Sequence, residues 1–115
     1  MKIRNCTKDA LIATKAGLAR SHAARLIGLL NRSSLEEGEA LVISPCKSVH
    51  TCFMRFPIDV VSLDAGGEVV GLVENMRPFR FSPIWGRAKA VVELPAGAIR
   101  IHNIEPRDRL ELTAD

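Results

Sequence analysis

Six consecutive residues, Ile58–Leu63, constrain the fold more than any other feature of the sequence. They are nearly all apolar and rich in β-branched side chains, which is typical of a strand that other elements cover on both faces. Gly66 and Gly67 then supply a turn, and residues 69–73 return with a similar character. We therefore predict a β-hairpin over residues 58–73 whose first strand lies inside the molecule.

The rest of the chain contains further short apolar runs, and turn residues separate them. We predict strands at residues 1–6, 10–13, 40–43, 90–94 and 109–112. Pro45 and Pro95 end two of these strands, and Gly17 is expected to close the N-terminal pair. Residues 97–103 fit either a strand or a single helical turn.

One segment has the periodicity of an amphipathic helix. Four apolar residues recur at the spacing that places them on one helical face: Ala23, Leu26, Ile27 and Leu30. The hydroxyl of Ser21 can accept a hydrogen bond from a free amide of the first turn, so we expect the helix to begin there. Its end is expected near Asn31 or Arg32.

These elements predict an α+β domain that is mostly β. About seven short strands at close spacing are typical of a sandwich or a small barrel, rather than of alternating strands and helices. A chain of 115 residues forms one domain, so we expect a single domain over residues 1–115. The predicted architecture is a small, partly open β-barrel-like domain with the helix covering one end or edge.

Charge and cysteine content indicate the compartment and the partners. The net charge of +3 is small. Three cysteines are an odd number, which argues against a full disulfide framework. The first residues lack the apolar run of a signal peptide, and no stretch approaches the roughly 20 residues that span a bilayer. We therefore expect a cytoplasmic monomer or weak dimer with no cofactor and no membrane partner.

The first candidate site is a cluster of metal-ligating side chains. Cys46, His50 and Cys52 would point the same way if this segment is extended. Thiolate and imidazole bind zinc, but a structural site needs four ligands, so His22 or His102 would have to complete it. Cys52 and His50 could also act as a nucleophile and its base. Alternatively, the two cysteines are simply small buried apolar residues.

The second candidate site is a loop at residues 75–92, which contains no acidic residue. It holds four cations and three aromatic residues: Arg77, Arg80, Arg87, Lys89, Phe79, Phe81 and Trp85. Charge combined with stacking suits an anionic small ligand, a peptide or single-stranded nucleic acid. The alternative is that the aromatic side chains plug an open end of the barrel while the arginines stay in water.

The third candidate site consists of carboxylates in apolar surroundings. Asp59 begins the buried strand, and Glu93 lies within another predicted strand. A buried carboxylate must be paired or hydrogen-bonded, so Asp59 would be structural if Arg55 or Arg77 meets it. Without such a partner, Asp59 would be a candidate general base.

Several blocks of the sequence resemble a known family. They are residues 28–32 (GLLNR), 38–41 (GEAL), 46–64 (CKSVHTCFMRFPIDVVSLD) and 93–97 (ELPAG). Together they resemble the bacterial and archaeal domain-of-unknown-function family 192 over nearly the whole chain. The resemblance implies a compact β-rich, barrel-like domain and brings no established activity.

The resemblance also weighs on individual residues. Five positions match the family pattern and are the best candidates for a site or for fold determinants: His50, Thr51, Met54, Asp59 and Glu93. Cys52 stands where the family often has an aromatic residue, which weakens both thiol hypotheses. Ser62 also replaces a common aromatic residue, which would open a small pocket or expose that strand. Arg107-Asp108 replaces a frequent Gly-Asp, so we expect the turn to survive with a different backbone conformation.

The leading hypothesis is a non-enzymatic binding or accessory domain. Its groove would lie between the 75–89 loop and the 50–55 segment. Hydrogen bonds, an anion contact and a stacking face would come from the following residues: His50, Thr51, Arg55, Arg77, Arg80 and Trp85. One alternative is a hydrolase- or transferase-type enzyme in which Asp59 or Glu93 orients His50 as general base. Another is weak binding of single-stranded nucleic acid.

Overall fold

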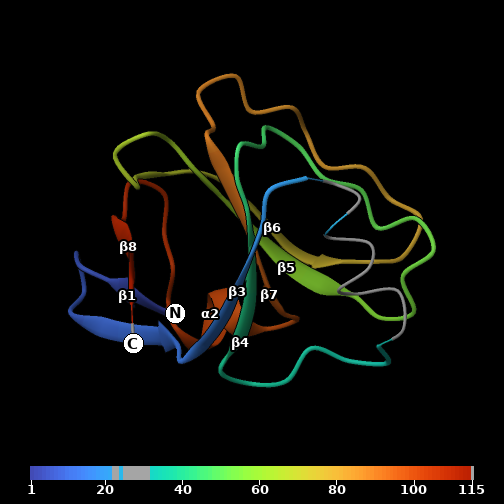
Figure 1. The fold of residues 1–115 in the computed structure, drawn as a ribbon, viewed down its shortest axis with the longest axis horizontal. Coiled ribbons are helices and arrows are strands. Elements are labelled where there is room, and N and C mark those ends of the chain that lie inside the picture. The colour runs from blue at the N-terminus through green and yellow to red at the C-terminus, as the bar shows by residue number, and fades with distance from the viewer. Residues whose placement is uncertain (22–23, 25–31, 115) are drawn as a thin grey trace.

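The computed structural model describes residues 1–21, 24 and 32–114, and these form eight strands in two sheets (Figure 1). The smaller sheet is antiparallel, with the order β2 (Ala10–Ala13), β1 (Lys2–Asn5), β8 (Leu110–Thr113). The larger sheet has the order β3 (Lys15–Ala19), β4 (Glu39–Ile43), β7 (Ala90–Pro95), β5 (Ile58–Leu63), β6 (Val69–Met76). Its neighbouring strands are antiparallel except for the parallel pair β3 and β4. The mostly β, α+β class is therefore confirmed.

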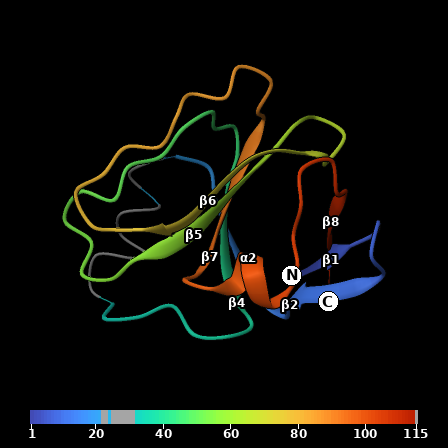
Figure 2. The same ribbon diagram turned by 180° about the vertical axis from the view of Figure 1, so that it is seen from behind.

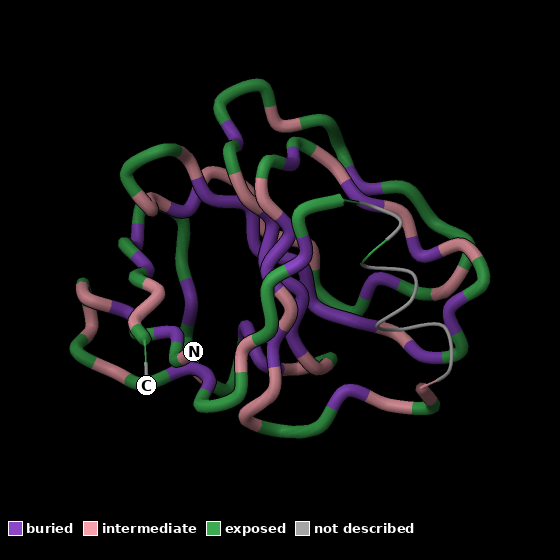
Figure 3. The backbone as a smooth tube through the Cα atoms, in the orientation of Figure 1, coloured by how far each residue is buried: buried purple, intermediate pink, exposed green. Residues whose placement is uncertain are grey.

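Strand β5 is buried along its whole length, as its apolar run predicts (Figure 3). It pairs with β6 on one side, which confirms the hairpin, and with β7 on the other. The hairpin turn needs glycine at position 67, where φ is +84°. A Cβ atom there would lie 2.4 Å from the carbonyl oxygen of Leu110 in the smaller sheet. Gly67 therefore permits the two sheets to approach at this corner.

Each face of the larger sheet covers its own hydrophobic core. The first core fills the space between the two sheets and beneath the short helix α2 (Ala98–Ile101), and it includes Val61, Val92 and Leu94. The second core lies on the opposite face, where Val60 and Val91 meet Val49 from the loop after β4. This double coverage explains why β5 and β7 are apolar on both faces.

The strands that we predicted as a partly open barrel form two separate sheets. Backbone hydrogen bonds join them at two corners, where Ala16 donates to Met1 (2.9 Å) and Val69 donates to Asp108 (2.8 Å). Within the described residues the strands do not close into a continuous barrel. In both ribbon views the N-terminus and the C-terminal strand lie at the smaller sheet, at the end away from the long loops (Figure 2).

Strand β3 is the element that the sequence did not predict. Gly17, which we expected to end the N-terminal unit, instead pairs with Leu41 inside β3. Residues 97–103 contain one helical turn, α2, which settles the ambiguity between strand and helix. The predicted helix over residues 21–32 falls almost entirely outside the described residues. At its expected start, the Ser21 hydroxyl accepts a hydrogen bond from the Ala24 amide (3.1 Å), as predicted.

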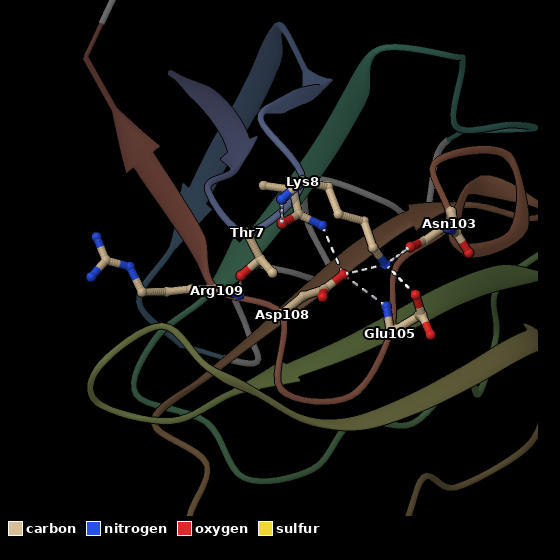
Figure 4. A network of polar contacts seen from close by, with 7 residues as sticks. Thr7, Lys8, Asn103, Glu105, Asp108 and Arg109 are labelled. Carbon is tan, nitrogen blue, oxygen red and sulfur yellow. Dashed lines mark hydrogen bonds and ion pairs between the residues drawn. The ribbon is translucent and has the colours of Figure 1, made fainter.

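A buried carboxylate fixes the turn before β8 (Figure 4). Asp108 Oδ2 accepts hydrogen bonds from Asn5 Nδ2 (2.9 Å), Lys8 Nζ (2.9 Å) and the Glu105 amide (3.0 Å). Burial alone would raise the pKa of Asp108, but these hydrogen bonds outweigh it and lower the pKa below its usual value. Arg107 has a φ of 73°, in the left-handed region that favours glycine. The expectation of a different backbone conformation here is therefore wrong, because the glycine-type conformation is present with arginine in place.

Candidate binding surface on two paired loops

Two long loops, residues 44–57 and 77–89, run side by side along one end of the molecule (Figures 1 and 2). We call them the paired loops. Five backbone hydrogen bonds connect them, with the amide donor named first: Thr51 to Arg80, Phe79 to Thr51, Ser82 to Val49, Trp85 to Lys47 and Cys46 to Lys89. These donor–acceptor distances are 2.9–3.0 Å, and His50 and Phe81 form an isolated β-bridge. The loops therefore hold each other in a defined conformation although neither belongs to a sheet.

Thr51 is the main anchor between the paired loops. Its side chain is fully buried, and its hydroxyl donates to the Arg77 carbonyl and accepts from the Arg80 amide (3.0 Å). Its own carbonyl accepts from the Phe79 amide (3.0 Å). A hydroxyl that is buried and used in this way is not available to a ligand. In this structure the Thr51 side chain shapes the loops instead of facing the solvent.

Trp85 anchors the second loop to the sheet. Its indole packs against the second core and lies directly over Gly71 of β6. A Cβ atom on Gly71 would lie 2.1 Å from the indole Nε1, so glycine is required for this approach. Ser62 is the cross-strand partner of Gly71, so two small residues stand side by side in this part of the sheet. The indole is half-buried, so the side that meets Gly71 is used for packing, and a stacking role for Trp85 stays a prediction.

The paired loops expose large apolar side chains. Seven such side chains are exposed in the described part of the chain, and four of them are on these loops. Their exposed fractions are 70% for Phe53, 58% for Phe79, 77% for Phe81 and 78% for Ile84. The Phe53 and Phe79 rings meet edge to face with centroids 5.7 Å apart. Contiguous exposed apolar groups of this kind mark interaction sites.

A cavity of about 390 Å³ lies beside these side chains. Its lining comes from both loops and consists of Ser48, Val49, His50, Phe81, Ser82 and Ile84. His50 is half-buried, its ring lies 6.0 Å from that of Phe81, and its Nδ1 accepts from the Cys52 amide (3.3 Å). The cavity falls in the region where we placed the groove, and it contains His50 from the predicted set.

Positive charge is concentrated on the paired loops. They carry six of the sixteen Lys and Arg residues and none of the thirteen Asp and Glu residues: Lys47, Arg55, Arg77, Arg80, Arg87 and Lys89. The rest of the chain therefore has ten cations and thirteen acids and is net negative. All six side chains belong to exposed residues. Among the described residues, only Arg87 of the six pairs with a carboxylate, Glu68 at 4.0 Å.

The two candidate carboxylates point to opposite faces of the larger sheet. Asp59 is opposite Leu94, which faces the first core, whereas Glu93 is opposite Val60, which faces the second core. His50 belongs to the loop on the second face. Asp59 therefore faces away from the side on which His50 lies, whereas Glu93 faces that side, and the orientation of His50 by Glu93 stays a prediction.

Asp59 is fully buried and has a structural role. Its two carboxylate oxygens accept from the Asn75 and Ile99 amides, both at 2.8 Å, so it ties β6 and α2 to β5. The expected pairing with Arg55 or Arg77 is replaced by these backbone donors. Glu93 is also fully buried, between Leu41 of β4 and Val60 of β5.

The described residues contain no group of three or more His, Cys, Asp and Glu side chains that could hold a metal ion. Cys46 is buried in the second core, and its thiol donates to the Ser48 carbonyl (3.0 Å). His50 Nδ1 accepts from the backbone amide of Cys52, so no thiol–imidazole pair is formed through this nitrogen. Among the described residues, Cys46, His50 and Cys52 thus form no such group, and Cys46 is buried as in the alternative interpretation. His22, one of the two possible fourth ligands, lies outside the described residues.

Sequence reasoning missed Phe53, Ile84 and Lys47. The signal was present, because residues 44–57 lack acidic residues just as residues 75–92 do. The predicted groove already placed the two segments together, but the sequence does not show which of their side chains are exposed. No helix of the described residues is long and apolar enough to cross a membrane.

A second, larger cavity lies on the other face of the sheet. It measures about 490 Å³, and its lining includes Asp59, Asn75 and Gly97. An exposed ion pair between Glu74 and Arg100 (3.7 Å) also belongs to it. Because Asp59 is already used by two backbone amides, this cavity offers a ligand mainly that exposed pair.

The fold and the surface define a class: a small two-sheet β domain with a basic, apolar pair of loops. Within that class, residues 3–112 match the model of the DUF192 family, whose description is Uncharacterized ACR, and the chain belongs to this family. The family resemblance in the sequence is thereby confirmed.

Individual relatives agree with this assignment. The chain is 35% identical over 112 residues to a UPF0127 protein of Pyrococcus furiosus, covering 93% of this chain and 94% of that protein. It is 42% identical over 64 residues to a UPF0127 protein of Thermococcus sibiricus, covering 56% of this chain and 41% of that protein.

Solved structures share the fold. The first is a protein of unknown function from Novosphingobium aromaticivorans, with a TM-score of 0.80, 21% identity and coverage of 96% of this chain and 82% of that chain. The second comes from Sinorhizobium meliloti, with a TM-score of 0.76, 21% identity and coverage of 96% and 89% respectively. At this identity the likeness concerns the fold alone.

Proposed function

We propose that the chain is a binding domain whose paired loops take a ligand that combines negative charge with apolar groups. The observation that carries this proposal is the segregation of charge. Six cations and no acid stand on the paired loops, while the remainder of the chain is net negative. Four exposed apolar side chains stand among these cations. Such a surface attracts an anion over a distance and retains it through apolar contact.

Specific residues would take specific parts in binding. Arg55, Arg77 and Arg80 would meet the negative charge, because the described structure gives them no carboxylate partner. Phe81 and Ile84, beside the cavity that includes His50, would contact the apolar part. A binding role is supported by the exposure of the cations and apolar side chains on the paired loops, which a ligand can reach directly.

A single domain in the cytoplasm is part of the same proposal. Cys6, Cys46 and Cys52 are all free thiols, which suits a reducing compartment. The matched family region, residues 3–112, spans both sheets and both paired loops, which suits one structural unit.

Anilinonaphthalene sulfonate, an aromatic anion, is a direct probe of this surface. We expect its fluorescence to rise with the folded protein, and its affinity to fall about tenfold in Phe81→Ser. Ile101→Ser is the matched control, because Ile101 is also exposed (70%) but lies on α2. Equal affinity of the Phe81→Ser variant and the wild type would overturn the proposal, as would an equal loss in the Ile101→Ser control.

A further inference from the structure

We propose that the partner of the paired loops is the surface of an anionic phospholipid bilayer. This inference rests on the proposed function and names the source of the negative charge. The apolar side chains would enter the interfacial region, and the cations would meet the lipid phosphates. The loops would thereby hold the domain at the membrane surface.

The apolar side chains of the paired loops project into solvent. Phe81 and Ile84 each expose more than three quarters of their surface, and Phe53 is nearly as exposed. They project from the loops, and Phe81 and Ile84 form part of the wall of the cavity beside them, which Ser48 and His50 also line. A peptide partner needs concave pockets for its own anchor residues. Projecting apolar side chains instead suit the boundary between lipid headgroups and acyl chains, which is fluid and can rearrange around them.

The aliphatic side chain of Ile84 favours a lipid over a nucleic acid. It has the largest exposed fraction of the large apolar side chains in the described chain, and it has neither a π-face nor a polar atom. Single-stranded nucleic acid would use aromatic faces for stacking. Here Phe53 and Phe79 meet edge to face, and Phe81 lies against His50. An acyl chain can contact all of these groups, because it needs no particular geometry.

The cations of the paired loops lie among the exposed apolar residues. Along the second loop, Arg77, Phe79, Arg80 and Phe81 are all exposed, so charge and apolar surface alternate over a short distance. Arginine side chains can keep the guanidinium at the level of phosphates while the stem follows the apolar groups inward. Each basic residue close to an anionic surface adds to the attraction. Arg87, which pairs with Glu68, contributes less.

The paired loops are already held in one conformation before any ligand binds. The loops are held by the buried Thr51, by Trp85 over Gly71, and by the Lys47 ammonium, which donates to the Gly86 (2.6 Å) and Ala88 (3.2 Å) carbonyls. Binding therefore orders few additional groups, which lowers its entropic cost. This proposal departs from our sequence-based expectation of no membrane partner, which rested on the lack of a segment long enough to span a bilayer.

Sedimentation with lipid vesicles tests the inference on the full chain. We expect co-sedimentation with vesicles of phosphatidylcholine mixed with phosphatidylglycerol, and much weaker binding to phosphatidylcholine alone. Arg77→Gln together with Arg80→Gln should weaken binding to the mixed vesicles about thirty-fold. Phe81→Ser together with Ile84→Ser should weaken it by at least about tenfold. Ile101→Ser should leave it unchanged, and circular dichroism checks that each variant folds.

The outcomes separate this inference from the proposed function. If the wild type binds anilinonaphthalene sulfonate but not mixed vesicles, the lipid partner is wrong and the binding surface stands. If it binds neither, both are wrong. Equal binding to neutral and mixed vesicles would refute the role of the cations. If oligothymidylate or polyglutamate at equal charge concentration displaces the protein from vesicles completely, the partner is a nucleic acid or an acidic peptide instead.

Discussion

Gly71→Ala tests whether Trp85 fixes the paired loops to the sheet. The new Cβ would lie 2.1 Å from Nε1, 2.4 Å from Cε2 and 2.6 Å from Cδ1 of the indole, all closer than real Cβ contacts. The indole must therefore move by roughly 1 Å or leave its site, because interiors are close-packed. Overpacking costs about 1–3 kcal/mol, and alanine regains about 0.4–1 kcal/mol by restricting the unfolded chain. We expect a net loss of about 1–2 kcal/mol in the free energy of unfolding.

Urea denaturation followed by circular dichroism measures this loss. Trp85 is the sole tryptophan of the chain, so its emission reports the indole directly, and we expect a red shift in the native state. In a Trp85→Ala background the same glycine substitution should be neutral or stabilise by about 0.5 kcal/mol, because the clash is gone. Gly86→Ala is the matched control in the same loop, since its Cβ would meet nothing within 4 Å. Additive effects of Gly71→Ala and Trp85→Ala, or unchanged emission in Gly71→Ala, would refute the reasoning.

Three further predictions concern the turn before β8 and the loop anchor. Because the folded pKa of Asp108 is lowered, its contribution is present above its unfolded value of 3.8 and is lost as the pH falls through the lower folded pKa. Asp108→Asn should therefore flatten the acid limb of a plot of unfolding free energy against pH, and an unchanged limb would contradict this. Arg107→Gly should stabilise by roughly 0.5–1 kcal/mol in thermal unfolding by relieving the left-handed φ of 73°; a loss of stability would show that the arginine side chain matters more. Thr51→Val keeps the shape but leaves the Arg80 amide without its buried hydroxyl acceptor, so it should cost about 2 kcal/mol and weaken probe binding. Thr7→Val is the control, because its hydroxyl accepts from the Arg109 amide (2.9 Å) at an exposed position where water can replace it, so it should cost clearly less and leave probe binding unchanged.

The sequence predicts the sheet where local pattern decides it. The apolar run of β5 and the glycines after it predict the hairpin, because burial on both faces leaves a continuous apolar, β-branched segment that is visible in the sequence. Strand β3 has no such signature. It contains Gly17, and it exists because it pairs in parallel with β4, which follows about twenty residues later. Long-range pairing of this kind leaves no trace in a local window.

The candidate site also has some features that the sequence shows and others that only the structure shows. The acid-free loop was visible in the sequence, because charge is a property of residue type. The roles of Thr51 and Asp59 were not visible, since the same side chain serves a ligand when exposed and the backbone when buried. That Asp59 and Glu93 point to opposite faces depends on the register between β5 and β7, which only the structure supplies.

The central claim is that the paired loops, rather than the cavity beside Asp59, form the binding surface. Amide chemical shifts of the isotope-labelled chain, recorded by NMR during titration with anilinonaphthalene sulfonate, test it most directly. The account predicts shifts concentrated in residues 47–55 and 77–87, around Phe81 and Ile84. Shifts concentrated instead at Glu74, Gly97 and Arg100, with the paired loops unchanged, would contradict it.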